Sequence, residues 1–173
     1  MRKQHSPQLR RCAGGLSARL WFQLAEAGRG CSKVHQRRRL RPLLAMATGR
    51  PRRCGWFDSV LTRFASQVNG LTGTAVTKLD VLDTLDEVKI ATAYRMPDGK
   101  TREFFPADTW ALSEVEPIYE TMPGWNSSTC DVRRIEDLPP NARAYLDRIE
   151  ELTNAPVKFV SVGTKRSQII PVD

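Results

Sequence analysis

The stretch GTAVTKLDVLD, residues 73–83, decides how the rest of the chain is interpreted. Its apolar pair Ala75-Val76 predicts a short strand that delivers a lysine and an aspartate at its end. Because side chains alternate along an extended chain, Lys78 and Asp80 are expected on the same side of it. They fit either a solvated ion pair or a base-reading pair, in which the carboxylate accepts hydrogen bonds from guanine's ring N–H and exocyclic amine. Adenine lacks this donor pair, so such a site would select guanine.

Before and after this stretch, apolar periodicity predicts a helix and a hairpin. The helix has Asp58 in its first turn and Asn69-Gly70 at its end, and five apolar residues recur at helical spacing: Phe57, Leu61, Phe64, Ala65 and Val68. Residues 87–95 alternate in polarity and predict a half-buried strand. The Pro-Asp-Gly sequence at 97–99 then predicts a tight hairpin turn.

The C-terminal third adds an extended segment, a helix and a strand. Residues 115–125 are expected to be extended and broken by two prolines. A helix is predicted to open at Pro139-Pro140 and to close near Asn154, with one apolar face: Ala142, Tyr145, Leu146, Ile149 and Leu152. Residues 156–163 predict a final strand. Mixed helices and strands indicate an α/β or α+β class.

Positive charge is concentrated in the first 46 residues. The formal net charge is +8, but residues 1–46 hold 11 of the 27 Lys+Arg and a single acid, Glu26. This basic head could be a transit peptide, an arm for nucleic acid or a membrane surface, or an unrelated extension; we favour the third and expect disorder. Residues 47–173 hold 16 basic and 18 acidic side chains, so their charge does not indicate a nucleic-acid partner. No run of 18 apolar residues predicts a membrane-spanning helix.

Cysteine and histidine placement excludes two kinds of chemistry. The four cysteines form no Cys-x-x-Cys pair, and both histidines, His5 and His35, lie in the head. A structural zinc site needs about four clustered ligands and is therefore not expected. The absence of histidine after residue 35 also excludes histidine-based acid–base or nucleophilic catalysis there.

Two further motifs carry candidate binding chemistry. The loop TGRPRRC, residues 48–54, crowds Arg50, Arg52 and Arg53 around one proline. It is either a solvated basic loop or an anion site for phosphates or a dicarboxylate, since guanidinium forks bind both. The sequence SVGTKR, residues 161–166, follows a predicted strand and offers a hydroxyl and a glycine turn for a base edge.

Together these motifs resemble a known family. The order ATGRPRRCGWFDSV, TKLDVLDTLDEVK, AYRMPDGK, VEPIYETMPGW and LPPNARAYLDRIEELTNAPVKFVSVGTKR is similar to the C-terminal portion of adenylosuccinate synthetase, over residues 47–173. The resemblance implies an α/β fold: a C-terminal fragment of a P-loop-like synthetase with mixed strands and helices, preceded by the unrelated head 1–46.

The resemblance also implies an activity and its partners. The family is a cytoplasmic ligase of purine and AMP biosynthesis that joins L-aspartate to inosine monophosphate (IMP) through a C–N bond. GTP is a co-substrate, Mg²⁺ is the cofactor, and the enzyme is a homodimer without nucleic-acid or membrane partners. GTP first phosphorylates the purine oxygen, and aspartate then displaces the phosphate.

Site residues follow by the same resemblance. GTP binding is implied for seven residues: Arg52, Lys78, Leu79, Asp80, Ser161, Val162 and Gly163. IMP binding is implied for Arg50. The aspartate loop is implied to run over Met46, Ala47, Thr48, Gly49, Arg50, Pro51 and Arg52, although Ala47 stands where the family usually has threonine and so lacks one hydroxyl.

The family's N-terminal nucleotide half has no counterpart in this sequence. No G-x-x-x-x-G-K-[ST] or other glycine-rich phosphate loop occurs, and the catalytic aspartate and histidine are absent. We therefore assign no catalytic residue and no metal ligand, expect the Mg²⁺ to be held by the missing half, and expect this chain alone to be inactive. The alternative is a non-catalytic guanine-nucleotide-binding module. Either way, residues 47–173 are expected to need a partner surface.

Overall fold

The computed structural model describes residues 43–44, 51–52, 55–106, 112 and 114–172. Disorder was predicted for residues 1–46, and most of these lie outside the described residues. The exception is a two-residue strand. That strand, β1 (Leu43–Leu44), pairs antiparallel with β2 (Pro51–Arg52), so part of the predicted arginine loop is one side of a small hairpin.

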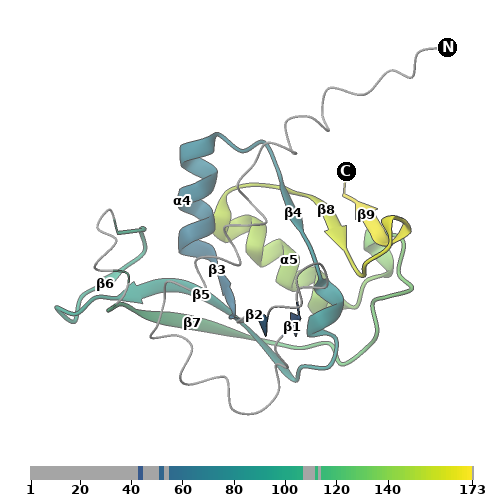
Figure 1. The fold of residues 1–173 in the computed structure, drawn as a ribbon, viewed down its shortest axis with the longest axis horizontal. Coiled ribbons are helices and arrows are strands. Elements are labelled where there is room, and N and C mark those ends of the chain that lie inside the picture. Colours follow the sequence, from purple (N-terminus) through teal and green to yellow (C-terminus); the bar gives the residue numbers. More distant parts are fainter. Residues whose placement is uncertain (1–42, 45–50, 53–54, 107–111, 113, 173) are drawn as a thin grey trace.

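The larger sheet is organised around the long strand β5 (Glu87–Arg95), as the sequence predicted. β3 (Phe57–Asp58) runs parallel to β5, whereas β6 (Thr101–Arg102) and β7 (Glu116–Pro123) run antiparallel to it (Figure 1). The predicted alternation holds at Val88, Ile90 and Tyr94 but fails at residues 91–93, where a bulge between Ala91 and Ala93 shifts the register against β7.

The turn after β5 is confirmed, whereas the predicted break in the next segment is wrong. Met96 donates to the carbonyl of Lys100 at 2.8 Å, and Gly99 adopts a φ of 79°. β7 is one continuous strand that contains both prolines, Pro117 and Pro123. Among the described residues β7 pairs only with β5, and prolines are tolerated on an edge strand.

The smaller sheet joins segments that are far apart in the sequence. β4 (Thr74–Val76) runs parallel to β8 (Val157–Ser161), which pairs antiparallel with β9 (Ile169–Pro171). The strands near 75–76 and 156–163 were predicted, but β9 was not. The described residues also contain three short 3₁₀ helices: η1 (Leu79–Leu82), η3 (Ile135–Asp137) and η4 (Arg166–Gln168).

Both predicted helices form, with caps that the sequence indicated. In α4 (Ser59–Asn69), Asp58 is the N-cap and accepts a hydrogen bond from the backbone of Leu61, and Gly70 ends the helix in the left-handed conformation. In α5 (Pro140–Thr153), Asn154 ends the helix in the same way. The face of α5 is buried as expected, with Leu152 half-buried and Thr153 fully buried in addition.

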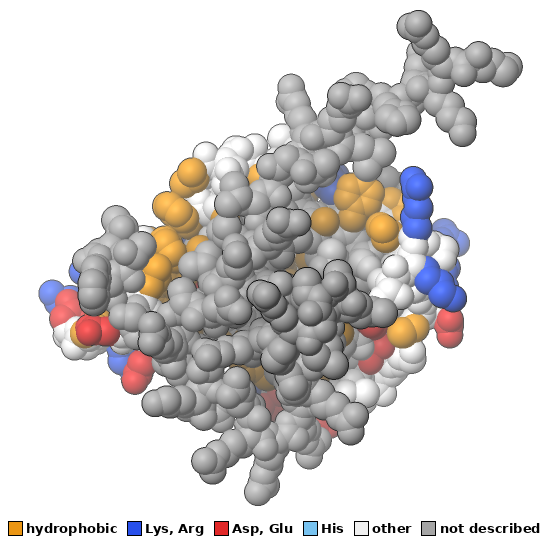
Figure 2. All heavy atoms as spheres, viewed as in Figure 1, with side chains coloured by type: hydrophobic (Ala, Val, Ile, Leu, Met, Phe, Trp, Pro, Cys, Tyr) orange, Lys and Arg blue, Asp and Glu red, His pale blue; other side chains and the backbone are white. Residues whose placement is uncertain are grey.

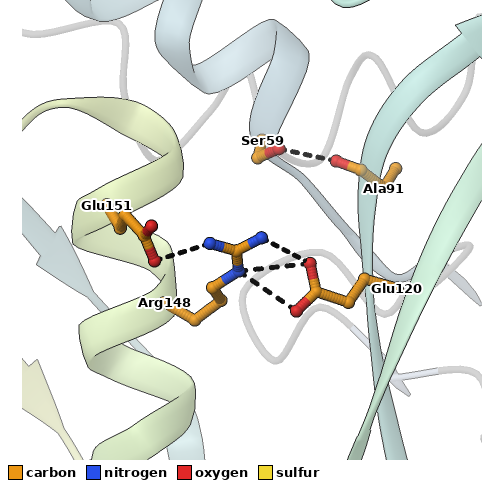
Figure 3. A network of polar contacts seen from close by, with 5 residues as sticks. All are labelled: Ser59, Ala91, Glu120, Arg148 and Glu151. Atoms are coloured by element: carbon orange, nitrogen blue, oxygen red, sulfur yellow. Dashed lines mark hydrogen bonds and ion pairs between the residues drawn. The ribbon is translucent and has the colours of Figure 1, made fainter.

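The predicted apolar face of α4 is largely exposed. Phe57 lies before the helix, in β3, while Phe64 and Val68 are 41% and 67% exposed. The helix buries Ser59, Val60 and Ser66 instead, and Ser59 Oγ donates to the carbonyl of Ala91 at 2.7 Å (Figure 3). Figure 2 shows hydrophobic side chains on the molecular surface along the α4 side.

One core connects the two sheets through α5. It contains residues of the larger sheet, of α5, of the smaller sheet and of η1: Phe57, Val88, Ile90, Trp125, Ala142, Tyr145, Leu146, Ile149, Val157, Val160, Val162, Ile170 and Leu79 among others. Burial in this core raises the pKa of the Tyr145 phenol well above its usual range. None of the described helices is both long and apolar enough to cross a membrane.

Candidate functional site

Two segments predicted to contact guanine leave the same edge of the smaller sheet. Val76 of β4 is paired with Val160 of the parallel strand β8, so the chain after each strand emerges side by side (Figure 1). Thr77–Asp80 therefore begins next to Ser161–Gly163, and η1 contacts β8 directly. In open α/β sheets, ligands bind at the carboxyl ends of parallel strands, where two such loops meet.

The expectation that Lys78 and Asp80 share one side of an extended strand is wrong. Lys78 adopts a left-handed conformation, with φ 64° and ψ 41°, and Leu79 begins the 3₁₀ helix η1. A positive φ is uncommon for a lysine and marks a sharp change of direction in the chain. Leu79 is 1% exposed and anchors the turn in the core, so its side chain does not face the surface where a ligand would bind.

Asp80 has an unusual environment for a surface-loop carboxylate. Its Oδ1 is buried and has no hydrogen-bond partner among the residues that the structure describes, although the side chain as a whole is half-buried. An unsatisfied buried acceptor costs roughly 1–3 kcal/mol, and a donor from a ligand would relieve that cost. Lys78 lies two residues before Asp80 in the sequence, and its side chain, which carries an ammonium group, is exposed.

The second loop offers backbone groups more than side chains. Ser161 Oγ donates to the carbonyl of Gly163 at 2.8 Å, so the predicted hydroxyl is engaged within the loop. Val162 is fully buried, and its N–H donates to the carbonyl of Gln168 at 3.0 Å. A Cβ on Gly163 would lie 2.4 Å from Oε1 of Gln168, so the amide of Gln168 would have to move to accommodate any larger residue there.

Sequence reasoning missed a buried polar cluster behind the first loop. Asp83 follows η1, is 7% exposed, and accepts hydrogen bonds from Trp125 Nε1 at 2.8 Å and from the backbone and hydroxyl of Thr129 at 2.7 and 3.0 Å. The partners lie more than 40 residues away in an irregular segment, so no local spacing could reveal them.

The predicted anion loop lies mostly outside the described residues. Met46, Ala47, Thr48, Gly49 and Arg50 belong to that undescribed part, and of Pro51 and Arg52 the structure gives only the backbone pairing in β2. The IMP and aspartate assignments stay predictions. Within the described residues, no group of three or more His, Cys, Asp or Glu side chains could hold a metal ion, so they do not fit a Mg²⁺ site.

Fold and site define a class: part of an α/β protein with paired loops at the carboxyl ends of neighbouring parallel strands. The sequence model of the adenylosuccinate synthetase family matches residues 41–170. This match covers well over half of the chain, and the chain belongs to the adenylosuccinate synthetase family.

Individual relatives agree with this membership and also show that the chain is partial. The adenylosuccinate synthetase of Carboxydothermus hydrogenoformans is 56% identical over 126 residues, and that of Moorella thermoacetica is 52% identical over the same length; each alignment covers 73% of this chain and 29% of the relative. A fully ligated adenylosuccinate synthetase from Plasmodium falciparum superposes with a TM-score of 0.69 at 31% identity, covering 73% of this chain and 30% of that one.

Proposed function

We propose that this chain is the C-terminal portion of an adenylosuccinate synthetase and carries the guanine-reading part of its GTP site. The observation that supports this most strongly is Oδ1 of Asp80, which is buried and has no hydrogen-bond partner among the described residues. Asp80 follows β4, whose parallel neighbour β8 leads into the second loop. In the proposed complex the Asp80 carboxylate accepts hydrogen bonds from the ring N–H and exocyclic amine of guanine. The stem of Lys78 lies over the base, and backbone groups of Ser161–Gly163 hold its other edge.

The reaction assigned to the whole enzyme joins L-aspartate to IMP in AMP biosynthesis. The γ-phosphoryl group of GTP is transferred to the purine 6-oxygen, and the aspartate amine then displaces phosphate and forms the C–N bond. Arg50 is proposed to bind the IMP side, Arg52 the GTP phosphates and aspartate, and the loop from Met46 to Arg52 the aspartate carboxylates. Bound Mg²⁺ would neutralise phosphate charge. The ion would be held by a part of the enzyme other than the described residues. A homodimer and a cytoplasmic location are proposed from the family alone.

The 173-residue chain is proposed to be inactive by itself, because positioning and charge stabilisation supply most of phosphoryl-transfer catalysis. The test is an assay of the purified chain for conversion of IMP that depends on both GTP and aspartate. We expect no turnover by the chain alone. Turnover should appear when a separately expressed N-terminal portion of a related synthetase is added. Robust activity of the chain alone would contradict the proposed inactivity.

A second candidate is a non-catalytic guanine-nucleotide-binding module, favoured by the absence of a phosphate-loop motif in the 173 residues. Calorimetry with GDP and ADP tests the guanine site common to both candidates. The wild-type chain should prefer GDP, and Asp80→Asn should abolish that preference, since the amide replaces one of the two acceptor oxygens of the carboxylate with an NH2 donor. Asp98→Asn, in the exposed hairpin turn, is the matched control. Equal binding of both nucleotides by the wild type would refute the guanine site. Complementation of turnover by the N-terminal portion separates the two candidates.

A further inference from the structure

The segment Gly124–Cys130, which has no part in the site as predicted, contacts both of its loops. We call this segment the brace. On one side it holds the end of η1: Asp83 accepts from the indole of Trp125 and from Thr129, as described above. Gly124 donates to the carbonyl of Asp86 at 2.8 Å, which fixes the start of the brace to the chain that leaves η1.

On its other side the brace holds the loop after β8. The carbonyl of Cys130 accepts from Nε2 of Gln168 at 3.0 Å. Oε1 of the same side chain accepts from the backbone of Lys165 at 3.0 Å, and the amide packs against Gly163. The backbone carbonyl of Gln168 accepts from Val162. The half-buried residue Gln168 therefore holds the turn 162–168 through both its side chain and its backbone.

Thr129 and Cys130 are neighbours in the chain, so the two sets of contacts form one connected path. It runs from η1 through Asp83 and Thr129 to Cys130, and from there through Gln168 to Gly163. Asp83 and Thr129 are both buried, so these hydrogen bonds are sheltered from competing water. Cys130 also accepts from Arg133 at 2.7 Å, which leaves its carbonyl well satisfied and oriented.

We infer that the brace sets the separation of the two guanine-binding loops, and that Thr129 and Gln168 are positioning residues for base selectivity. This inference rests on the proposed guanine site. Neither residue needs to touch the nucleotide: Thr129 holds η1, and with it Asp80, while Gln168 holds the turn at Gly163. A hydrogen-bonding site loses discrimination when its groups are displaced, even where the pocket can still hold a flat base.

The test compares GDP with inosine diphosphate (IDP), which lacks the exocyclic amine, on the full 173-residue chain. Thr129→Val keeps the shape but removes the hydroxyl bonds to Asp83, and Gln168→Met keeps the length but removes both amide bonds. Thr121→Val and Gln67→Met are matched controls at exposed positions. Wild-type chain should bind GDP about tenfold more tightly than IDP, because one hydrogen bond to a charged group is at stake.

Thr129→Val and Gln168→Met are each expected to lower the ratio of GDP affinity to IDP affinity at least about threefold, and each control to leave it unchanged. A ratio that stays at the wild-type value in both Thr129→Val and Gln168→Met would overturn the inference. So would an equal loss of affinity for both nucleotides, which is the signature of general destabilisation. If Thr129→Val fails to fold, as judged by tryptophan fluorescence, Gln168→Met at its half-buried position decides alone. Absence of any GDP preference in the wild type would refute the guanine site itself.

Discussion

Gly124 occupies a position where no side chain fits. A Cβ built there would lie 1.8 Å from the carbonyl oxygen of Leu85, and the opposing atoms are backbone that cannot rotate away. The segment around Gly124 and the segment around Leu85 must therefore separate to accommodate even one methyl group. Both segments take part in the contacts of the brace. The glycine is required by close approach, since its φ is not among the positive values in the described residues.

We predict that Gly124→Ala lowers the free energy of unfolding by about 3 kcal/mol or more, as overpacking against rigid backbone does. Urea denaturation followed by tryptophan fluorescence measures this change. Gly99→Ala is the control: nothing lies within 4 Å of its Cβ, and only its positive φ is strained, which costs about 1 kcal/mol. A Gly124→Ala cost no larger than that of the control would contradict the steric argument.

Asp58 combines capping with burial. Burial raises the pKa of its carboxyl above the ordinary 3.8, although hydrogen bonds from Leu61 and from the Tyr94 hydroxyl oppose the shift. The folded state therefore binds this proton more tightly than the unfolded state. The resulting stabilisation is complete below the ordinary pKa and is lost as the pH rises through the raised one.

We predict that Asp58→Asn becomes progressively more stable relative to the wild type as the pH rises from about 4 to about 7, since asparagine caps equally well and carries no charge. Chemical denaturation of both proteins across this range measures the difference. A difference in unfolding free energy that does not change with pH would show that the carboxylate is not penalised by burial.

At the scale of elements, one ion-pair network joins the outer side of α5 to β7. Arg148 donates to both carboxylate oxygens of Glu120, at 2.8 to 3.1 Å, and to Glu151 one turn along its own helix (Figure 3). These hydrogen bonds raise the pKa of the Arg148 guanidinium beyond its usual value. The bidentate geometry connects a helix and a strand that have few other contacts.

A double-mutant cycle with Arg148→Ala and Glu120→Ala should give a coupling free energy of about 1 kcal/mol, the upper range for a partly exposed pair. High salt should reduce it, because the side chains are about one-third exposed. The exposed pair Arg95–Glu116, with its single 3.7 Å contact, is the control and should give less. Coupling at Arg148 that is zero or insensitive to salt would disprove this account.

The long elements β5 and α5 were predicted well; among the short ones, β4 was predicted, whereas η1 and β9 were not. β5 has the predicted bounds, and the buried face of α5 was read almost completely, because each repeats its pattern over many residues. Extended chain was predicted where η1 forms. The prediction was wrong because a single residue, Lys78, turns the backbone by adopting a positive φ. β9 acquires its structure only from pairing with β8, a contact that local sequence does not encode.

For the candidate site, the sequence predicted residues, which stay predictions, but did not predict how their loops are held. Lys78, Asp80 and Ser161–Gly163 carry recognisable chemistry, and their two loops meet at one sheet edge. Asp83, Thr129 and Gln168 were missed because each is a common polar residue whose role comes from a partner distant in sequence. Their importance follows from burial and hydrogen bonding, which only the folded chain defines.

At the scale of the whole molecule, the exposed side of α4 is unusual for a chain that folds alone. Phe64 stacks on Phe105 at a centroid distance of 4.9 Å, and Val68 and Phe104 are more than half exposed nearby in the chain. The chain spans about 29% of the length of its curated relatives. Apolar patches of this kind promote association.

We predict that the isolated chain self-associates and that Val68→Lys reduces this association without loss of stability, since the side chain makes no buried contact. Sedimentation velocity over a concentration series measures the association. Gln67→Lys adds the same charge at the neighbouring exposed position and should have a weaker effect. Equal effects of the two variants would mean that net charge, rather than the apolar patch, controls association.

The pairing of β4 with β8 also has a kinetic consequence. The hydrogen bond from Thr74 to Pro156 spans 82 residues of sequence. During synthesis, β4 leaves the ribosome long before its partner strand exists, and loop-closure entropy then delays their meeting. The edge at which β4 and β8 end is thus among the last parts of this chain to form. In a cell, chaperones would encounter newly synthesised chains in which the larger sheet can already be formed while β4 and β8 are still unpaired.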